Sequence, residues 1–127
     1  MKRFFLVCGS ILAIAVAGYL GFHASVAYGT ACGISNIQKS FSPSACTVTI
    51  TWNTSTSTDE NYVHWGANSG CTNPSYPNTA NATSGTSHTA VIDCTDVGPK
   101  IAFQVESIGA SCSETSGCNT ATSGPCF

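Results

Sequence analysis

The sequence predicts an antiparallel β-sandwich that follows an apolar N-terminal helix. Short segments alternate between apolar and polar residues, and clusters of Gly, Pro, Asn and Ser separate them. No window shows the sustained period of 3.6 residues that an amphipathic helix requires. A chain of 127 residues has room for one such domain. We place it at residues 28–127, after a leader of residues 1–27.

The clearest strand is predicted at residues 46–52, where Cys46, Val48, Ile50 and Trp52 share one face and threonines occupy the other. Such a strand covers a core on one side only. Further strands are predicted at residues 62–66, 87–94 and 100–106, and Ile34 and Ile37 indicate a short first strand. Alternation directs Val63, Trp65, Ile101, Phe103 and Val105 inward and His64, Ala102, Gln104 and Glu106 outward. We therefore expect both tryptophans to be buried between the sheets.

The leader begins with Lys2 and Arg3, and residues 4–22 carry no charge. A basic start, an apolar stretch and small residues are typical of a cleaved export signal. The uncharged stretch also approaches the length that crosses a bilayer, so a retained membrane anchor is a second interpretation. A third is lipidation at Cys32, which follows small residues.

The composition of the chain argues against nucleic-acid binding and against metal or cofactor binding. Charged residues make up 8% of the chain, with only four Lys and Arg in total, so the basic surface that nucleic acid requires is missing. Eight cysteines in so short a chain favour disulfides in an oxidising compartment. Their spacing contains no C-x2-C pair, and we expect no metal and no cofactor.

The order of several short segments resembles a fibronectin type III domain. The segments are residues 34–37 (ISNI), 47–52 (TVTITW), 63–66 (VHWG), 87–89 (SHT), 97–99 (VGP) and 103–105 (FQV). The order of these segments most resembles the fibronectin-like domain that precedes the catalytic domain of purple acid phosphatases, and similar bacterial surface modules. The resemblance implies a seven-stranded antiparallel immunoglobulin-like sandwich, with strands near residues 34–39, 46–52, 61–66, 87–94, 100–107 and 119–123. The tyrosine usual near the start of the sixth strand is replaced by Ile101, and no catalytic residues carry over.

The same topology implies a register and a grouping of the cysteines. It places Trp52 opposite His88 and Val48 opposite Ile92. The disulfides it favours are Cys46–Cys94, Cys71–Cys126 and Cys112–Cys118, although other pairings stay open. Cys32 is then left unpaired or joined to a second chain.

Other side chains offer few candidate sites. The histidines are His23, His64 and His88, and we expect a structural hydrogen bond for His88. Asp93 and Glu106 point outward on different strands, no nucleophile and base stand at a catalytic spacing, and we expect no enzyme. Tyr62, Tyr76 and His64 are candidates for a small aromatic contact patch. Asn53 and Asn81 begin glycosylation sequons.

These observations predict an exported, disulfide-stapled, non-catalytic binding or adhesion module at the cell surface. One alternative is a structural subunit of an extracellular filament or surface layer, assembled through sheet edges and the retained apolar helix. Another is a secreted cysteine-rich inhibitor or effector. The expected partner is a protein or a second copy of this chain, with no nucleic acid, and with a membrane only through a retained N-terminal segment.

Overall fold

The computed structural model describes residues 30–67, 70–95 and 97–124. The predicted leader and its apolar helix lie outside these residues, as do His23 and Cys126. The strands are β1 (Ser35–Ser42), β2 (Thr47–Thr58), β3 (Glu60–Ala67), β4 (Asn78–Asn81), β5 (Gly85–Asp93), β6 (Lys100–Ile108), β7 (Ser113–Thr115) and β8 (Asn119–Thr122). Across the described ranges, no helix is long and apolar enough to cross a membrane.

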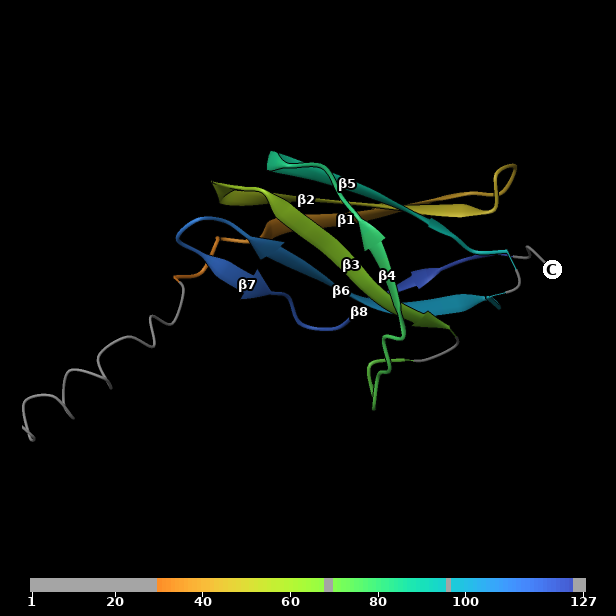
Figure 1. Ribbon diagram of the computed structural model, residues 1–127. Helices are drawn as coiled ribbons and strands as arrows, with labels where there is room; N and C mark the ends of the chain where they lie inside the picture. The colour runs from red at the N-terminus through yellow and green to blue at the C-terminus, as the bar shows by residue number, and fades with distance from the viewer. Residues whose placement is uncertain (1–29, 68–69, 96, 125–127) are drawn as a thin grey trace, which may run out of the picture.

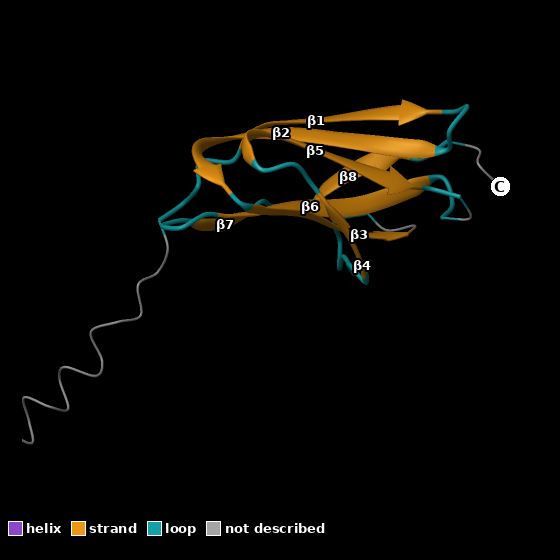
Figure 2. Ribbon diagram, turned by 45° about the horizontal axis from the view of Figure 1, so that its top comes forward, coloured by secondary structure: helices purple, strands orange, loops and turns teal. Residues whose placement is uncertain are grey.

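Two antiparallel sheets form the predicted sandwich. The first sheet has the order β1-β2-β5, and the second has the order β4-β3-β6-β7, with β8 also paired to β6. Figure 1 shows the strands from the side of β3 and β4, and Figure 2 shows the two sheets as separate layers. Two short strands, β4 and β7, were not predicted, because strands of three or four residues carry too little pattern.

Strands β7 and β8 together form one interrupted edge along β6. The end of β6 pairs with β7, and its start pairs with β8. Between them Ser116 spans the break: its backbone N–H donates to Val105 O at 2.8 Å, and its Oγ accepts from Val105 N at 3.0 Å. The edge is therefore continuous in hydrogen bonding although the strand is broken.

The predicted register between the strands of the first sheet is confirmed. Trp52 lies opposite His88, and Val48 lies opposite Ile92. The threonines of β2 therefore face away from the core, because successive residues of a strand point to opposite faces.

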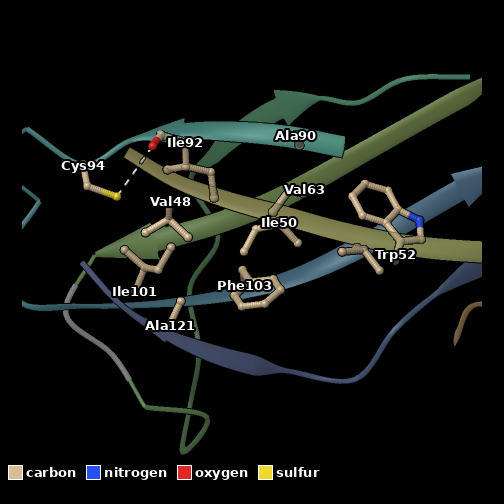
Figure 3. Close-up of a cluster of buried hydrophobic side chains, with 11 residues drawn as sticks. Val48, Ile50, Trp52, Val63, Ala90, Ile92, Cys94, Ile101, Phe103 and Ala121 are labelled. Atoms are coloured by element: carbon tan, nitrogen blue, oxygen red, sulfur yellow. Dashed lines mark hydrogen bonds between the residues drawn. The ribbon is translucent and has the colours of Figure 1, made fainter. Parts of the chain in front are cut away.

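The inward residues form one continuous apolar core (Figure 3). Its members are Val48, Ile50, Trp52, Val63, Ala90, Ile92, Cys94, Ile101, Phe103, Val105 and Ala121. Trp52 is 1% exposed, as predicted. Trp65 is only partly buried, because it lies near the end of β3 beside the short edge strand β4. Ile101 is fully buried, so an aliphatic side chain occupies the position where the resemblance would have a tyrosine.

A set of hydrogen-bonded polar side chains closes the core beyond Trp52. We call it the buried polar cluster; its members are Thr54, Thr58, Asn61, His88 and Ser107. His88 Nδ1 lies 2.7 Å from Thr83 O, and its Nε2 lies 2.9 Å from Thr54 Oγ1. A carbonyl only accepts, so Nδ1 carries the proton and the ring is anchored on both sides. The prediction of a structural hydrogen bond for His88 is confirmed.

The same cluster satisfies the other buried donors. The indole N–H of Trp52 donates to Ser107 Oγ at 3.0 Å, and its ring centroid lies 5.2 Å from that of His88. The Thr58 hydroxyl donates to Asn61 Oδ1 at 2.7 Å. Buried polar groups are tolerated when they are paired in this way.

The predicted disulfide pairings are wrong for the described cysteines. Cys32 is not left over, because it forms a disulfide with Cys112. The segment around it runs beside β7: Thr30 bridges to Cys112, and Ser113 N donates to Thr30 O at 3.1 Å. This pairing brings the Cα atoms of Cys32 and Cys112 to 5.1 Å, within the range that a disulfide spans.

Cys112–Cys118 and Cys71–Cys126 do not form, because Cys118 is bonded to Cys71. Strand β7 lies between Cys112 and Cys118 and extends along β6. Six extended residues span up to about 20 Å, so a short sequence separation does not bring two cysteines together when a strand separates them.

Cys46 and Cys94 are neighbours but are not bonded to each other. The N–H of Cys94 donates to Cys46 O at 2.8 Å, yet Cys94 is a free, buried thiol and Cys46 belongs to another disulfide. Cys46 has a φ of 51°, in the left-handed region, and its Sγ lies 3.7 Å from Pro43 O. The Cys94 thiol instead points into the core, 3.7 Å from Ile92 O (Figure 3).

Candidate functional site

The outer face of the second sheet carries the richest group of polar and aromatic side chains. Tyr62 and His64 of β3 alternate with the buried Val63, so they point away from the core. We call this surface the tyrosine face and define it by Tyr62, His64, Thr79, Gln104 and Glu106. The register aligns Tyr62 with Glu106 and His64 with both Gln104 and Thr79.

His64 is hydrogen-bonded through both ring nitrogens. Its Nε2 lies 2.7 Å from Glu106 Oε2, and its Nδ1 lies 3.1 Å from Thr79 Oγ1. A carboxylate only accepts, so Nε2 donates to Glu106, while Nδ1 and the Thr79 hydroxyl share the second hydrogen bond. The side chains of His64 and Glu106 are 24% and 27% exposed. The ring and one carboxylate oxygen are therefore held in fixed positions while staying accessible.

Tyr62 lies beside this pair in a negative environment. Its ring centroid is 6.0 Å from that of His64, and its hydroxyl donates to Glu60 Oε2 at 3.4 Å. The charge of Glu60, with smaller contributions from desolvation and Glu106, raises the pKa of Tyr62 above its usual value. The phenol therefore stays neutral at physiological pH, and its surroundings favour ligands without negative charge.

A loop between β3 and β4 bounds the tyrosine face at one end. The disulfide between Cys71 and Cys118 ties this loop to the break between β7 and β8. A Cβ added at Gly66 would lie 1.9 Å from Ser75 O, so only glycine allows the loop to lie this close. Ala102, opposite Gly66 in the sheet, is fully buried although alternation directs it outward. The loop covers the sheet at Gly66 and Ala102, and the tyrosine face ends there.

The outer face of the first sheet differs in composition. It presents the threonines of β2, flanked by Ser40 of β1 and by Thr89 and Val91 of β5. Val91 is 55% exposed. Asp93 lies at the end of β5, where the backbone N–H of Thr95 donates to it at 2.9 Å and lowers its pKa. No charged partner of Asp93 stands within the described residues of this face.

A small cavity lies where the edges of β1 and β8 approach each other. Its volume is about 210 Å³, and Lys39, Phe41, Val48 and Ala121 are among its lining residues. The Lys39 ammonium donates to Thr120 O across the opening. Because the Lys39 ammonium already donates to Thr120 O, the cavity offers a ligand only a small apolar surface.

The structure brings together only some of the predicted candidates. Tyr62 and His64 share one surface, whereas Tyr76 belongs to the loop and Asp93 to the opposite sheet. Alternation places Glu106 outward without giving it a partner, and the register between β3 and β6 brings it beside His64. Knowing that these two strands pair with Tyr62 opposite Glu106 is the signal that would have found the contact.

Both predicted glycosylation asparagines are exposed within strands. Asn53 lies in β2 opposite Ser35 and Ser87, and Asn81 lies in β4 opposite Tyr62. The hydroxyls of their sequons already take part in hydrogen bonds: Ser55 donates to Cys32 O, and Thr83 donates to Ser87 O. The structure leaves both assignments as predictions.

Within the described residues, no group of three or more His, Cys, Asp or Glu side chains is arranged to hold a metal ion. Comparison with known proteins adds no relative: no family model matches the chain, and neither a curated protein nor a solved structure matches it significantly. The geometry of the tyrosine face is therefore the main guide to function.

Proposed function

We propose that this protein is an exported, disulfide-stapled, non-catalytic binding module of the cell surface, and that it binds its partner on the tyrosine face. The observation that carries the proposal is the arrangement of Tyr62, His64 and Glu106. Two hydrogen bonds hold His64 between Thr79 and Glu106 on an open sheet surface. A binding site gains affinity when its polar groups are oriented before the ligand arrives.

The strand order supports a fibronectin type III-like domain within this proposal. Strands β1, β2 and β5 correspond to A, B and E of such a domain, and β4, β3, β6 and β8 correspond to C′, C, F and G. Domains of this architecture present side chains and loops on a rigid core, and their function depends on the particular surface.

The disulfides support export. The bonds Cys32–Cys112 and Cys71–Cys118 join segments that are far apart in sequence. Bonds of this kind persist outside the reducing cytosol. Together with the predicted leader, they favour a location at the cell surface.

The sheet edges favour a binding module over the alternative of a filament subunit. At the edge of β5, Thr83 accepts from and donates to Thr89: its N–H bonds Thr89 O at 3.3 Å, and its Oγ1 accepts from Thr89 N at 3.1 Å. At the other edge of the sandwich, Lys39 bonds Thr120 O. Edges covered in this way offer less backbone to a neighbouring copy.

A binding assay on intact cells tests the proposal. We expect purified full-length protein to bind cell surfaces, and Tyr62→Ala to lose most of that binding. The matched control is Thr49→Ala, which removes an outward side chain from the first sheet and should bind as the parent does. Protection of the native protein from external protease, or equal binding by Tyr62→Ala, would contradict the proposal. Polymers that form equally well with Tyr62→Ala would favour the filament instead.

A further inference from the structure

The tyrosine face combines an aromatic ring with polar groups that have spare hydrogen-bonding capacity. Glu106 uses Oε2 for His64, and its Oε1 accepts no hydrogen bond from the described part of the chain. The amide of Gln104, beside His64 in the register, likewise has no partner among the described residues. A carboxylate oxygen and a primary amide together can accept from and donate to neighbouring hydroxyls.

Tyr62 supplies the apolar part of the surface. Tyrosine presents a flat hydrophobic ring and keeps its hydroxyl in water. Tyr62 is half-buried beside His64, with its hydroxyl turned to Glu60. A ring held at the centre of a sheet, with polar groups in the next strand, suits a ligand whose own rings have apolar faces and hydroxyl-bearing rims.

We propose that the tyrosine face binds a neutral polysaccharide, with one sugar ring stacked on Tyr62 and its hydroxyls bonded by Glu106 and Gln104. This inference rests on the proposed function and specifies its ligand. The face is bounded by the loop held by Cys71–Cys118 at one end only. An open surface lets a chain extend beyond the site, whereas a single small sugar would need an enclosing cleft.

The charge distribution selects neutral chains. Glu60, two residues before Tyr62 on β3, and Glu106, opposite it on β6, both raise its pKa, so the local field is negative. Uronate-containing or sulfated polysaccharides would be repelled. A protein partner is less suited, because the core of a protein interface gathers several aromatic and apolar side chains, whereas the tyrosine face presents a single aromatic residue of that kind, Tyr62. The one large apolar side chain that stands exposed in the described ranges, Val91, lies on the opposite sheet.

Electrophoresis in native gels that contain soluble polysaccharides tests this assignment. The probes are β-glucan, xyloglucan, galactomannan and dextran as neutral chains, and polygalacturonate as the anionic chain. We expect at least one neutral chain to retard the full-length protein and polygalacturonate to leave it unaffected. Retardation by none of the neutral chains, or stronger retardation by polygalacturonate, would overturn the inference.

Variants then assign binding to the tyrosine face. Tyr62→Ala should lower affinity for the retarding polysaccharide by at least about tenfold, and Tyr62→Phe should stay near the parent because it keeps the ring. Glu106→Gln should weaken binding by about three- to tenfold. Thr49→Ala is the control on the other sheet. Equal binding by Tyr62→Ala, with a melting curve that shows it folded, would place the ligand elsewhere and overturn the assignment.

Periodate separates failure of this inference from failure of the proposed function. Periodate cleaves the vicinal diols of sugars on intact cells and leaves a protein receptor's backbone intact. Loss of cell binding after mild treatment supports a polysaccharide ligand. Undiminished, Tyr62-dependent binding to treated cells, together with no retardation by β-glucan, whose (1→3)-linked units lack vicinal diols, would overturn the polysaccharide and leave the binding module standing. Absence of any Tyr62-dependent binding to untreated cells would overturn both.

Discussion

Two histidines in this small domain show how position determines what the same side chain does. His88 is fully buried, and both of its nitrogens bond to groups inside the sandwich. His64 also bonds through both nitrogens, but on an open surface and to a carboxylate that keeps one oxygen unused. The first arrangement satisfies polar groups that would otherwise be buried without partners. The second holds polar groups in place for something outside the chain.

The largest expected effect comes from Trp52, whose indole lies between the apolar core and the buried polar cluster. Trp52→Ala should lower the free energy of unfolding by about 3–5 kcal/mol, because it empties an aromatic core site and removes the donor to Ser107. Chemical denaturation measures the change. A melting temperature within a degree or two of the parent would show that Trp52 does not belong to the core.

The disulfide next to the buried polar cluster should come second. The Sγ of Cys32 lies 3.3 Å from Ser107 O. Its disulfide joins it to Cys112, which is 80 residues away in the sequence. Replacing both cysteines by alanine should cost about 2–4 kcal/mol, chiefly by freeing the unfolded chain. Non-reducing peptide mapping of the parent checks the pairing first. A Cys112–Cys118 peptide would contradict it.

His88→Ala should cost about 2–3 kcal/mol, because Thr83 O and Thr54 Oγ1 lose a buried partner and a space opens beside Trp52. The measurement is again unfolding in denaturant. A change below about 0.5 kcal/mol would mean that water replaces the ring without penalty, and that the buried polar cluster is not structural.

His64→Ala provides the contrasting result. We expect the free energy of unfolding to stay within about 0.5 kcal/mol of the parent, because the removed bonds are exposed to water. Binding to the ligand of the tyrosine face should nevertheless fall, since Glu106 loses the bond that orients it. If His64→Ala destabilised the fold as strongly as His88→Ala, the distinction between the two histidines would fail.

The smallest expected effect concerns the pKa of Tyr62 and the stability of the fold at high pH. Glu60 and Glu106 raise the pKa of Tyr62 in the folded protein, so above pH of about 10 the unfolded chain releases its phenol proton before the folded chain does. Stability therefore falls as pH rises through this range. Glu60→Gln should move the titration of Tyr62 to lower pH, as followed by NMR. An unchanged titration would mean that Glu60 does not act on the phenol.

Much of the sandwich could be predicted because strand alternation is a local property. Residues 46–52 reveal their inward face through Val48, Ile50 and Trp52, whatever strand lies next to them. The register of Trp52 with His88 came from the resemblance, and the inward faces of the two strands agreed with it, because a shift by one residue would have turned apolar side chains to solvent. The candidate site was harder: alternation places His64 and Glu106 outward, but their contact depends on which strands are neighbours.

The sequence by itself determined the class of fold, the inward residues and the abundance of cysteine. Only the tertiary structure decided which cysteines are bonded, that Cys94 stays a buried thiol, and that Ala102 lies under a loop. Burial raises the pKa of the Cys94 thiol, which keeps it protonated and unreactive beside the disulfide of Cys46. The physical reason is the distance in sequence over which each feature acts. Alternation is set by adjacent residues, whereas a disulfide or an ion pair forms only when the fold brings two segments that are far apart in the sequence to within a few ångströms.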